Sequence, residues 1–383
     1  MSVTKPQGFR ASGVTAGFKD SGKSDLALVV NDGPSHAAAC VFTSNRCKAN
    51  PVIWSEEVIK DGEAAAIILN SGGANCYTGP DGFALTHATA ESVAGELGVS
   101  AGDVLVCSTG LIGPLFSRDK MLAAIPLAVE ALSPDGADAA ASAIMTTDTV
   151  SKQATYAGDG WSIGAMAKGA GMLAPALATM LIVVTTDADL PAAQLGQSLR
   201  TASERSFNRL DSDGCQSTND TVALLASGAS KTSPDLETFT EALTDVCVDL
   251  AQQLMRDAEG ASHDLYITTR HAASESDALE VSRSVARSNL FKCAVFGNDP
   301  NWGRVLAAAG TTGAQFEPHH LDVAINGVWV CRDGQGSADP DTVDMTPRKC
   351  EILIDLKAGD AEATVWSNDL THDYVHENSA YST

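Results

Sequence analysis

The sequence predicts an α/β fold in which helices cover mixed β-sheets in a layered sandwich. Short apolar runs typical of strands are bounded by Gly, Asn or Ser, and amphipathic segments typical of helices alternate with them. The chain has 383 residues, of which 44% are hydrophobic and 19% charged, the composition of a folded globular protein. Its length allows two or three domains or one large layered body, and therefore a sizeable core.

The strand pattern appears in five runs, at residues 27–30, 65–69, 104–107, 180–185 and 351–356. One uncharged stretch, residues 169–186, is long enough to suggest a membrane helix. It contains Pro175, and its Gly-rich first half has weak helix propensity. We therefore expect a loop that leads into a strand buried on both faces, and no membrane-spanning segment.

The helical pattern has apolar residues three and four positions apart with charged residues between them. It occurs at residues 83–97, 117–132, 192–206, 235–259 and 274–287. Because these segments alternate with the strands, helices are expected to cover sheets built from both halves of the chain.

Charge and cysteine content limit the possible partners and the compartment. Lys and Arg number 25 against 48 Asp and Glu, a net charge of −23, which repels nucleic acid and anionic membranes. The nine cysteines are scattered without a C-x-x-C pair, so we expect reduced thiols rather than a disulfide framework or a zinc module. The first residues lack the apolar run of a secretory signal, and a cytoplasmic location is expected.

Residues 17–24, GFKDSGKS, satisfy the formula of a phosphate-binding loop. Such a loop needs a strand before it and a helix after it, so that backbone N–H groups and the helix dipole converge on phosphate. No apolar strand of useful length is expected before Gly17, and the residues from Asp25 to Val30 resemble a strand. The match is interpreted as a Gly/Ser turn.

Residues 160–164, GWSIG, match the nucleophile elbow of serine hydrolases. Asp159 and Gly160 instead predict a two-residue hairpin turn, which makes Ser162 an ordinary strand residue. No metal site is predicted, because H-E-x-x-H is absent and the ligand spacing of a calcium loop is not met around Asp211 and Asp213. The latter pair is interpreted as an acidic turn.

Residues 168–181, KGAGMLAPALATML, place Thr179 directly before a strongly apolar run. A threonine hydroxyl is a weak nucleophile without a neighbouring base. Cleavage of the preceding peptide bond would free the α-amine of Thr179, whose pKa near 8 suits it to accept a proton at neutral pH. On spacing alone, the simpler interpretation is stronger: Ala178 and Thr179 open a core strand.

The wider context favours chemistry at Thr179. The chain closely resembles the ornithine acetyltransferase family, also called the glutamate N-acetyltransferases of arginine biosynthesis, nearly from end to end. The blocks that carry this resemblance are residues 8–13 (GFRASG), 41–45 (VFTSN), 70–75 (NSGGAN), 108–110 (STG), 144–149 (IMTTDT), 168–181, 217–221 (STNDT), 297–304 (GNDPNWGR) and 378–383 (NSAYST). Their order and spacing make the resemblance specific.

The resemblance implies the family's α/β sandwich and self-cleavage between Ala178 and Thr179. The products would be an α chain of residues 1–178 and a β chain of residues 179–383 that begins with the nucleophile. It assigns the oxyanion hole to Thr109 and Gly110. The substrate-binding residues that it implies are Thr146, Lys168, Thr179, Glu259, Asn378 and Thr383, with Thr147 as the alternative to Thr146.

The implied reaction passes the acetyl group of N2-acetyl-L-ornithine through Thr179 to L-glutamate, without a metal or organic cofactor. Lys168 and Glu259 match the carboxylate and the ammonium of the donor. The family also implies an α2β2 heterotetramer and, in some members, acetyl-CoA as a further donor. Two alternatives stay open: a self-processing amidase or aminopeptidase that passes the acyl group to water, and an uncleaved small-molecule-binding protein.

Overall fold

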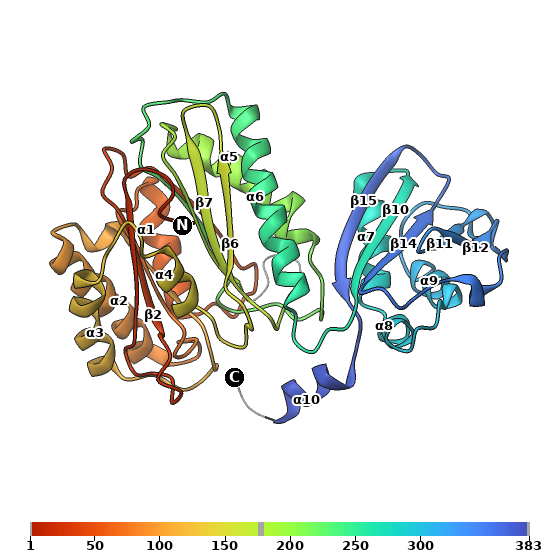
Figure 1. Cartoon of the computed structure of the whole chain (residues 1–383), viewed down its shortest axis with the longest axis horizontal. Helices are drawn as coiled ribbons and strands as arrows, with labels where there is room; N and C mark the ends of the chain where they lie inside the picture. Colours follow the sequence, from red (N-terminus) through yellow and green to blue (C-terminus); the bar gives the residue numbers. More distant parts are fainter. Residues whose placement is uncertain (1, 175–179, 381–383) are drawn as a thin grey trace.

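The structure is a computed structural model that describes residues 2–174 and 180–380. It consists of a larger body, formed by the N-terminal half and the chain up to helix α6, and a smaller body formed by strands β10 to β15 and their helices (Figure 1). The last helix, α10 (His372–Ala380), leaves the smaller body and runs back toward the larger one (Figure 1).

Two sheets stack face to face in the larger body. The first has the order β1-β2-β4-β5. Its strands are β1 (Phe9–Val14), β2 (Leu26–Asn31), β4 (Ala66–Asn70) and β5 (Val104–Ser108). The second has the order β3-β9-β8-β7-β6. Its strands are β3 (Ala38–Phe42), β9 (Thr221–Ala226), β8 (Leu181–Thr186), β7 (Ser162–Lys168) and β6 (Lys152–Ala157).

Alternating side chains divide the core into layers. Along β8, Leu181 and Val183 pack between the two sheets, whereas Ile182 and Val184 pack against the outer helices. Those outer helices are α5 (Ala192–Arg205) and α6 (Leu236–Arg256). The first sheet is covered by α2 (Gly79–Leu97) and α3 (Arg118–Glu130), with α1 (Asn50–Val58) beside them and α4 (Ala137–Ala143) against β1. The predicted layered α/β sandwich is therefore confirmed.

The smaller body contains one six-stranded sheet of order β13-β12-β11-β14-β10-β15. Its strands are β10 (Asp264–Ala272), β11 (Asp322–Ile325), β12 (Val328–Arg332), β13 (Gln335–Gly336), β14 (Lys349–Asp355) and β15 (Ala361–Asn368). Helices α7 (Glu275–Ala286), α8 (Asn289–Phe296) and α9 (Trp302–Ala309) share its apolar core. Short 3-10 turns lie at Ile59–Asp61, Ala101–Asp103, Phe207–Arg209, Pro318–His320 and Pro340–Thr342.

All five predicted strands and all five predicted helices are present, as β2, β4, β5, β8 and β14 and as α2, α3, α5, α6 and α7. The hairpin turn is confirmed as well, because β6 and β7 pair and the N–H of Gly158 donates to the carbonyl of Trp161. All nine cysteines are free thiols in the structure. Within the described residues, no helix has the length and hydrophobicity needed to cross a membrane.

One expectation about residues 17–24 is wrong. Strand β1 ends at Val14, shortly before Gly17, although its sequence FRASGV is only partly apolar. It forms because its whole length pairs antiparallel with the fully buried β2. The strand expected after residues 17–24 is confirmed, because β2 is the next element of the chain.

Candidate active site

A cavity of about 180 Å³ joins the two bodies of the molecule. It contains every implied site residue that the structure describes. Its lining residues are Thr109, Gly110, Thr146, Thr147, Lys168, Gly171, Met172, Asp213, Cys215, Glu259, Tyr374 and Asn378. Ala178, Thr179 and Thr383 lie outside the described residues.

Thr109 and Gly110 directly follow β5, whose partner β4 fixes where the strand ends. The N–H of Thr109 donates to the carbonyl of Asn70, with 2.9 Å between nitrogen and oxygen. Gly110 has a φ of +130°, and a Cβ there would lie 2.9 Å from the backbone of Gly73. Only glycine fits this turn, which places a hydroxyl and a backbone N–H together at the cavity wall.

Lys168 ends β7 and is almost fully buried, with 1% of its surface exposed. Its Nζ donates to Oγ1 of Thr109 over 3.4 Å, so the hydroxyl proton of Thr109 is free to point into the cavity. The pKa of Lys168 lies below its ordinary value, chiefly because the ammonium is buried and also because Lys152 is close. The carboxylates of Asp148, Asp220 and Glu259 oppose this shift. This end of the cavity therefore holds a desolvated cation beside a hydroxyl.

Glu259 forms the opposite wall, three residues after the end of α6. Its Oε1 accepts a hydrogen bond of 2.7 Å from the hydroxyl of Thr147, and its Oε2 accepts one of 3.0 Å from Nδ2 of Asn378 in α10. Both bonds hold the carboxylate between a loop of the larger body and the terminal helix. Thr146 also lines the cavity, and its backbone N–H donates to Oδ2 of Asp148.

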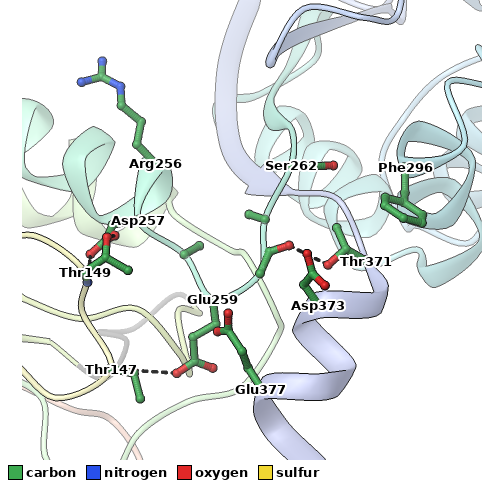
Figure 2. Close-up of a pocket in the computed structure, with 13 residues that line it drawn as sticks. Thr147, Thr149, Arg256, Asp257, Glu259, Ser262, Phe296, Thr371, Asp373 and Glu377 are labelled. Atoms are coloured by element: carbon green, nitrogen blue, oxygen red, sulfur yellow. Dashed lines mark hydrogen bonds between the residues drawn. The ribbon is translucent and has the colours of Figure 1, made fainter.

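A second cavity of about 460 Å³ adjoins the first and shares Thr147 and Glu259 with it. Figure 2 shows the carboxylates of Glu259 and Glu377 pointing into this space, between the end of α6 and helix α10. Partial burial and the nearby charge of Glu259 raise the pKa of Glu377. The wider opening is therefore acidic.

Gly171 lies directly beneath the carboxylate of Glu259. A Cβ at this position would be 2.6 to 2.7 Å from the carboxylate atoms of Glu259. The N–H of Glu259 also donates to the carbonyl of Ala170. Ala170 and Gly171, in the Gly-rich segment before Thr179, therefore pack directly against Glu259.

Asp220 anchors the first described residue after Thr179. Its Oδ1 accepts a hydrogen bond of 3.1 Å from the N–H of Met180, and the residue is completely buried. Burial raises the pKa of Asp220 well above its usual range, although the N–H of Met180 opposes this. Leu181 then pairs with Lys168 across β8 and β7, which places the start of β8 beside the buried ammonium.

Sequence reasoning missed several residues of the cavity wall. Asp213, interpreted as part of an acidic turn, lines the cavity and accepts hydrogen bonds from the N–H groups of Met172 and Cys215. Tyr374 arrives from α10. A buried carboxylate cannot be told from a surface one by local pattern, and the position of a terminal helix depends on packing.

In the described part of the chain, no group of three His, Cys, Asp or Glu side chains is arranged to hold a metal ion.

Comparisons with known proteins identify a family that this chain is similar to. The sequence matches the ArgJ family over residues 10–383. It is 60% identical over 382 residues to the arginine biosynthesis bifunctional protein ArgJ of Streptomyces coelicolor, with 100% of both chains covered. The protein of the same name from Thermobifida fusca is 58% identical over 383 residues, again with 100% of both chains covered. A crystal structure of ornithine acetyltransferase complexed with ornithine, from Mycobacterium tuberculosis, is 53% identical over 47% of this chain and 96% of that chain, with a TM-score of 0.45.

Proposed function

Because the chain belongs to the ArgJ family, we propose that it is an acetyltransferase of arginine biosynthesis that passes the acetyl group of N2-acetyl-L-ornithine to L-glutamate. One structural observation carries the proposal beyond family membership. A single cavity joins a buried ammonium, a carboxylate and a hydroxyl beside a backbone N–H, at Lys168, Glu259, Thr109 and Gly110. These groups match the charges of the donor and the oxyanion of acyl transfer.

The nucleophile is Thr179, freed by self-cleavage. Its Oγ attacks the carbonyl carbon of Ala178, the C–N bond breaks as the nitrogen takes the hydroxyl proton, and water hydrolyses the resulting ester. The cut falls between β7 and β8, which pair along their whole length, while β8 also pairs with β9. These ladders hold the α chain of residues 1–178 and the β chain of residues 179–383 together after cleavage.

Acetyl transfer then proceeds in two steps. Thr179 Oγ attacks the acetyl carbonyl while its α-amine takes the hydroxyl proton, and that proton leaves with the amine of ornithine. Glutamate attacks the acetyl-threonine through its α-amine and regenerates the free hydroxyl. In both steps the hydroxyl of Thr109 and the N–H of Gly110 donate hydrogen bonds to the oxyanion, and the nearby ammonium of Lys168 favours its charge.

Substrate contacts follow from charge. Lys168 binds the α-carboxylate, and Glu259 binds the side-chain ammonium of the donor. Thr146 contacts the substrate, whereas Thr147 orients Glu259 through the hydrogen bond that it donates. Asn378, in α10, and Thr383 complete the proposed set of substrate contacts. The relatives' name calls them bifunctional, and a second activity with acetyl-CoA as donor is part of this proposal. The proposed assembly is an α2β2 heterotetramer in the cytoplasm.

Two measurements test the proposal together. Denaturing mass spectrometry of the purified protein should find two chains, the second beginning at Thr179, and a single chain for Thr179→Ala. Incubation with N2-acetyl-L-ornithine and L-glutamate should then accumulate N-acetyl-L-glutamate and L-ornithine. Accumulation of acetate, with or without glutamate, would identify a hydrolase, and an intact wild-type chain without turnover would identify a binding protein.

A further inference from the structure

Lys152 is a buried lysine that the proposed chemistry does not use. It begins β6, and its side chain has no exposed surface. Its Nζ donates to Oδ1 of Asp148 over 2.7 Å, to Oδ2 of Asp257 over 2.5 Å and to the carbonyl of Val150 over 3.3 Å. Among the described residues, neither wall of the two joined cavities includes Lys152.

Asp148 connects this ammonium to two segments of the active site. Its Oδ2 accepts the N–H of Thr146 over 3.0 Å, which fixes the loop that carries Thr146 and Thr147. Its Oδ1 also accepts the N–H of Gly169 over 2.7 Å, and Gly169 directly follows Lys168. One carboxylate therefore sets where β7 ends and where the threonine loop lies.

Asp257 connects the same ammonium to the opposite wall. Its Oδ2 accepts the N–H of Thr149 over 3.0 Å, and it stands two residues before Glu259. Figure 2 shows Asp257 beside Thr149 and, further along the same two segments, Glu259 beside Thr147. Lys152 thus lies at the point where the segments that carry Thr147, Lys168 and Glu259 meet.

A gain in stability is weak grounds for retaining this arrangement. Replacing a buried ion pair by apolar side chains is often neutral or stabilising, since desolvation offsets the attraction between the charges. What such a group does provide is a fixed geometry, because each of its charges requires its partner. The segments joined here are those whose separation determines how a substrate with two opposite charges fits.

We propose that Lys152 is a positioning residue for acetyl transfer: by holding Asp148 and Asp257 together, it fixes the placement of Lys168 relative to Glu259. It does this without touching substrate. The inference rests on the proposed function, since it assumes that this cavity binds N2-acetyl-L-ornithine. Its distinctive consequence is selectivity for a donor that carries both a carboxylate and a side-chain ammonium.

The test compares two donors that differ only in that ammonium, N2-acetyl-L-ornithine and N2-acetyl-L-norvaline. In Lys152→Met, we expect kcat/KM for the ornithine donor to fall by about tenfold or more relative to the norvaline donor. A change of folding or of overall flexibility would lower both values equally. Rates are expressed per cleaved enzyme, with cleavage quantified by mass spectrometry. Lys152→Arg, which keeps the charge, should recover part of the selectivity.

Lys357→Met is the matched control. Lys357 is also held by two carboxylates, Asp322 and Asp333, but in the sheet of the smaller body. This variant should keep the wild-type donor ratio. If Lys152→Met fails to fold, the same measurement is made on the triple variant Asp148→Asn/Lys152→Met/Asp257→Asn, which leaves no unpaired charge. The single variant Asp257→Asn is a milder change, because it removes only one of the two carboxylates.

The outcomes separate the two proposals. A wild-type protein that transfers no acetyl group from either donor would overturn the proposed function, whatever the variants do. An active wild type whose folded Lys152 variants keep the donor ratio within about twofold would overturn the positioning role alone. A selective loss of the ornithine donor in these variants, with the ratio unchanged in Lys357→Met, supports it.

Discussion

The two walls of the cavity are built in different ways. The strand-end wall, formed by Thr109, Gly110 and Lys168, follows directly from β5 and β7, and Thr109 and Lys168 are 2% and 1% exposed. The helix wall is formed by Glu259, Tyr374 and Asn378. Glu259 lies in the connection between α6 and β10, and the other two lie in the terminal helix α10, where Asn378 is exposed. The first wall is part of the core, and the second lies on the surface.

This difference separates two tasks. An oxyanion site needs donors that do not reorganise during the reaction, and strand ends inside a double sheet provide them. A substrate must also enter and leave, and a wall held by few contacts allows this. Glu259 is held to the larger body by the hydroxyl of Thr147 and the carbonyl of Ala170. Helix α10 is joined to the Glu259 segment by the hydrogen bond from Thr371 to the carbonyl of Gly260 and by the bond from Asn378 to Glu259.

Thr109→Val should have the largest effect, because it removes a donor from the strand-end wall and conserves shape. We expect kcat to fall by about 100-fold, the usual consequence of losing one oxyanion donor. Steady-state kinetics with N2-acetyl-L-ornithine and glutamate measure it. Thr364→Val, which breaks a hydroxyl pair with Thr268 in the smaller body, is the control. An unchanged kcat in Thr109→Val would remove Thr109 from the oxyanion site.

Asp148→Asn should reveal the electrostatic dependence of the same wall. Burial raises the pKa of Asp148, but the charges of Lys168 and Lys152 lower it by more than burial raises it. The resulting pKa is about 2, against the ordinary 3.8. Since the folded pKa is depressed, the stabilisation is present above pH 3.8 and is lost as the pH falls toward 2. The depression corresponds to about 2 kcal/mol.

Denaturant unfolding at several pH values measures this effect, in an uncleaved Thr179→Ala background so that unfolding involves one chain. The free energy of unfolding of Asp148→Asn should lie below that of its parent near neutral pH. The difference should narrow between pH 4 and pH 2, where the parent carboxylate becomes protonated. A difference that stays constant over that range would contradict the assigned charge state.

Gly171→Ala should affect the helix wall without touching the oxyanion site. The added methyl group would lie 2.6 to 2.7 Å from the carboxylate atoms of Glu259, so this carboxylate must shift from the position in which it accepts hydrogen bonds from Thr147 and Asn378. We expect KM for N2-acetyl-L-ornithine to rise by about tenfold, with a smaller change in kcat. Gly95→Ala, in α2, is the matched control, because a Cβ there meets nothing within 4 Å. Equal KM values in both variants would argue against Glu259 as the ammonium partner.

Asn378→Ala should have the smallest effect. It removes one exposed hydrogen bond to Glu259, whose other oxygen still accepts from Thr147. A bond of this kind is worth about 1 kcal/mol, so KM should rise by only about fivefold and the unfolding midpoint should not change. A loss comparable to that in Thr109→Val would show that α10 belongs to the rigid part of the site.

Local pattern predicted the central elements well. The apolar runs of β2, β4 and β8 are buried on both faces, and such runs identify strands without knowledge of their neighbours. Strand β1 escaped prediction because pairing, and not its own composition, makes it a strand. The helix α10 escaped because its sequence HDYVHENSA has little apolar periodicity.

The amino-acid sequence by itself determined the family, the α/β class, the segment that contains Thr179 and the oppositely charged pair at Lys168 and Glu259. Only the tertiary structure decided that these charges face one cavity, that Thr147 rather than Thr146 holds Glu259, and that Asp213 and Lys152 belong to the same region. The physical reason is the distance along the chain over which each kind of interaction acts. Strand and helix patterns arise from neighbours along the chain. Cavity walls instead join segments far apart in the sequence, such as those of Thr109 and Asn378, and their meeting depends on the packing of whole sheets.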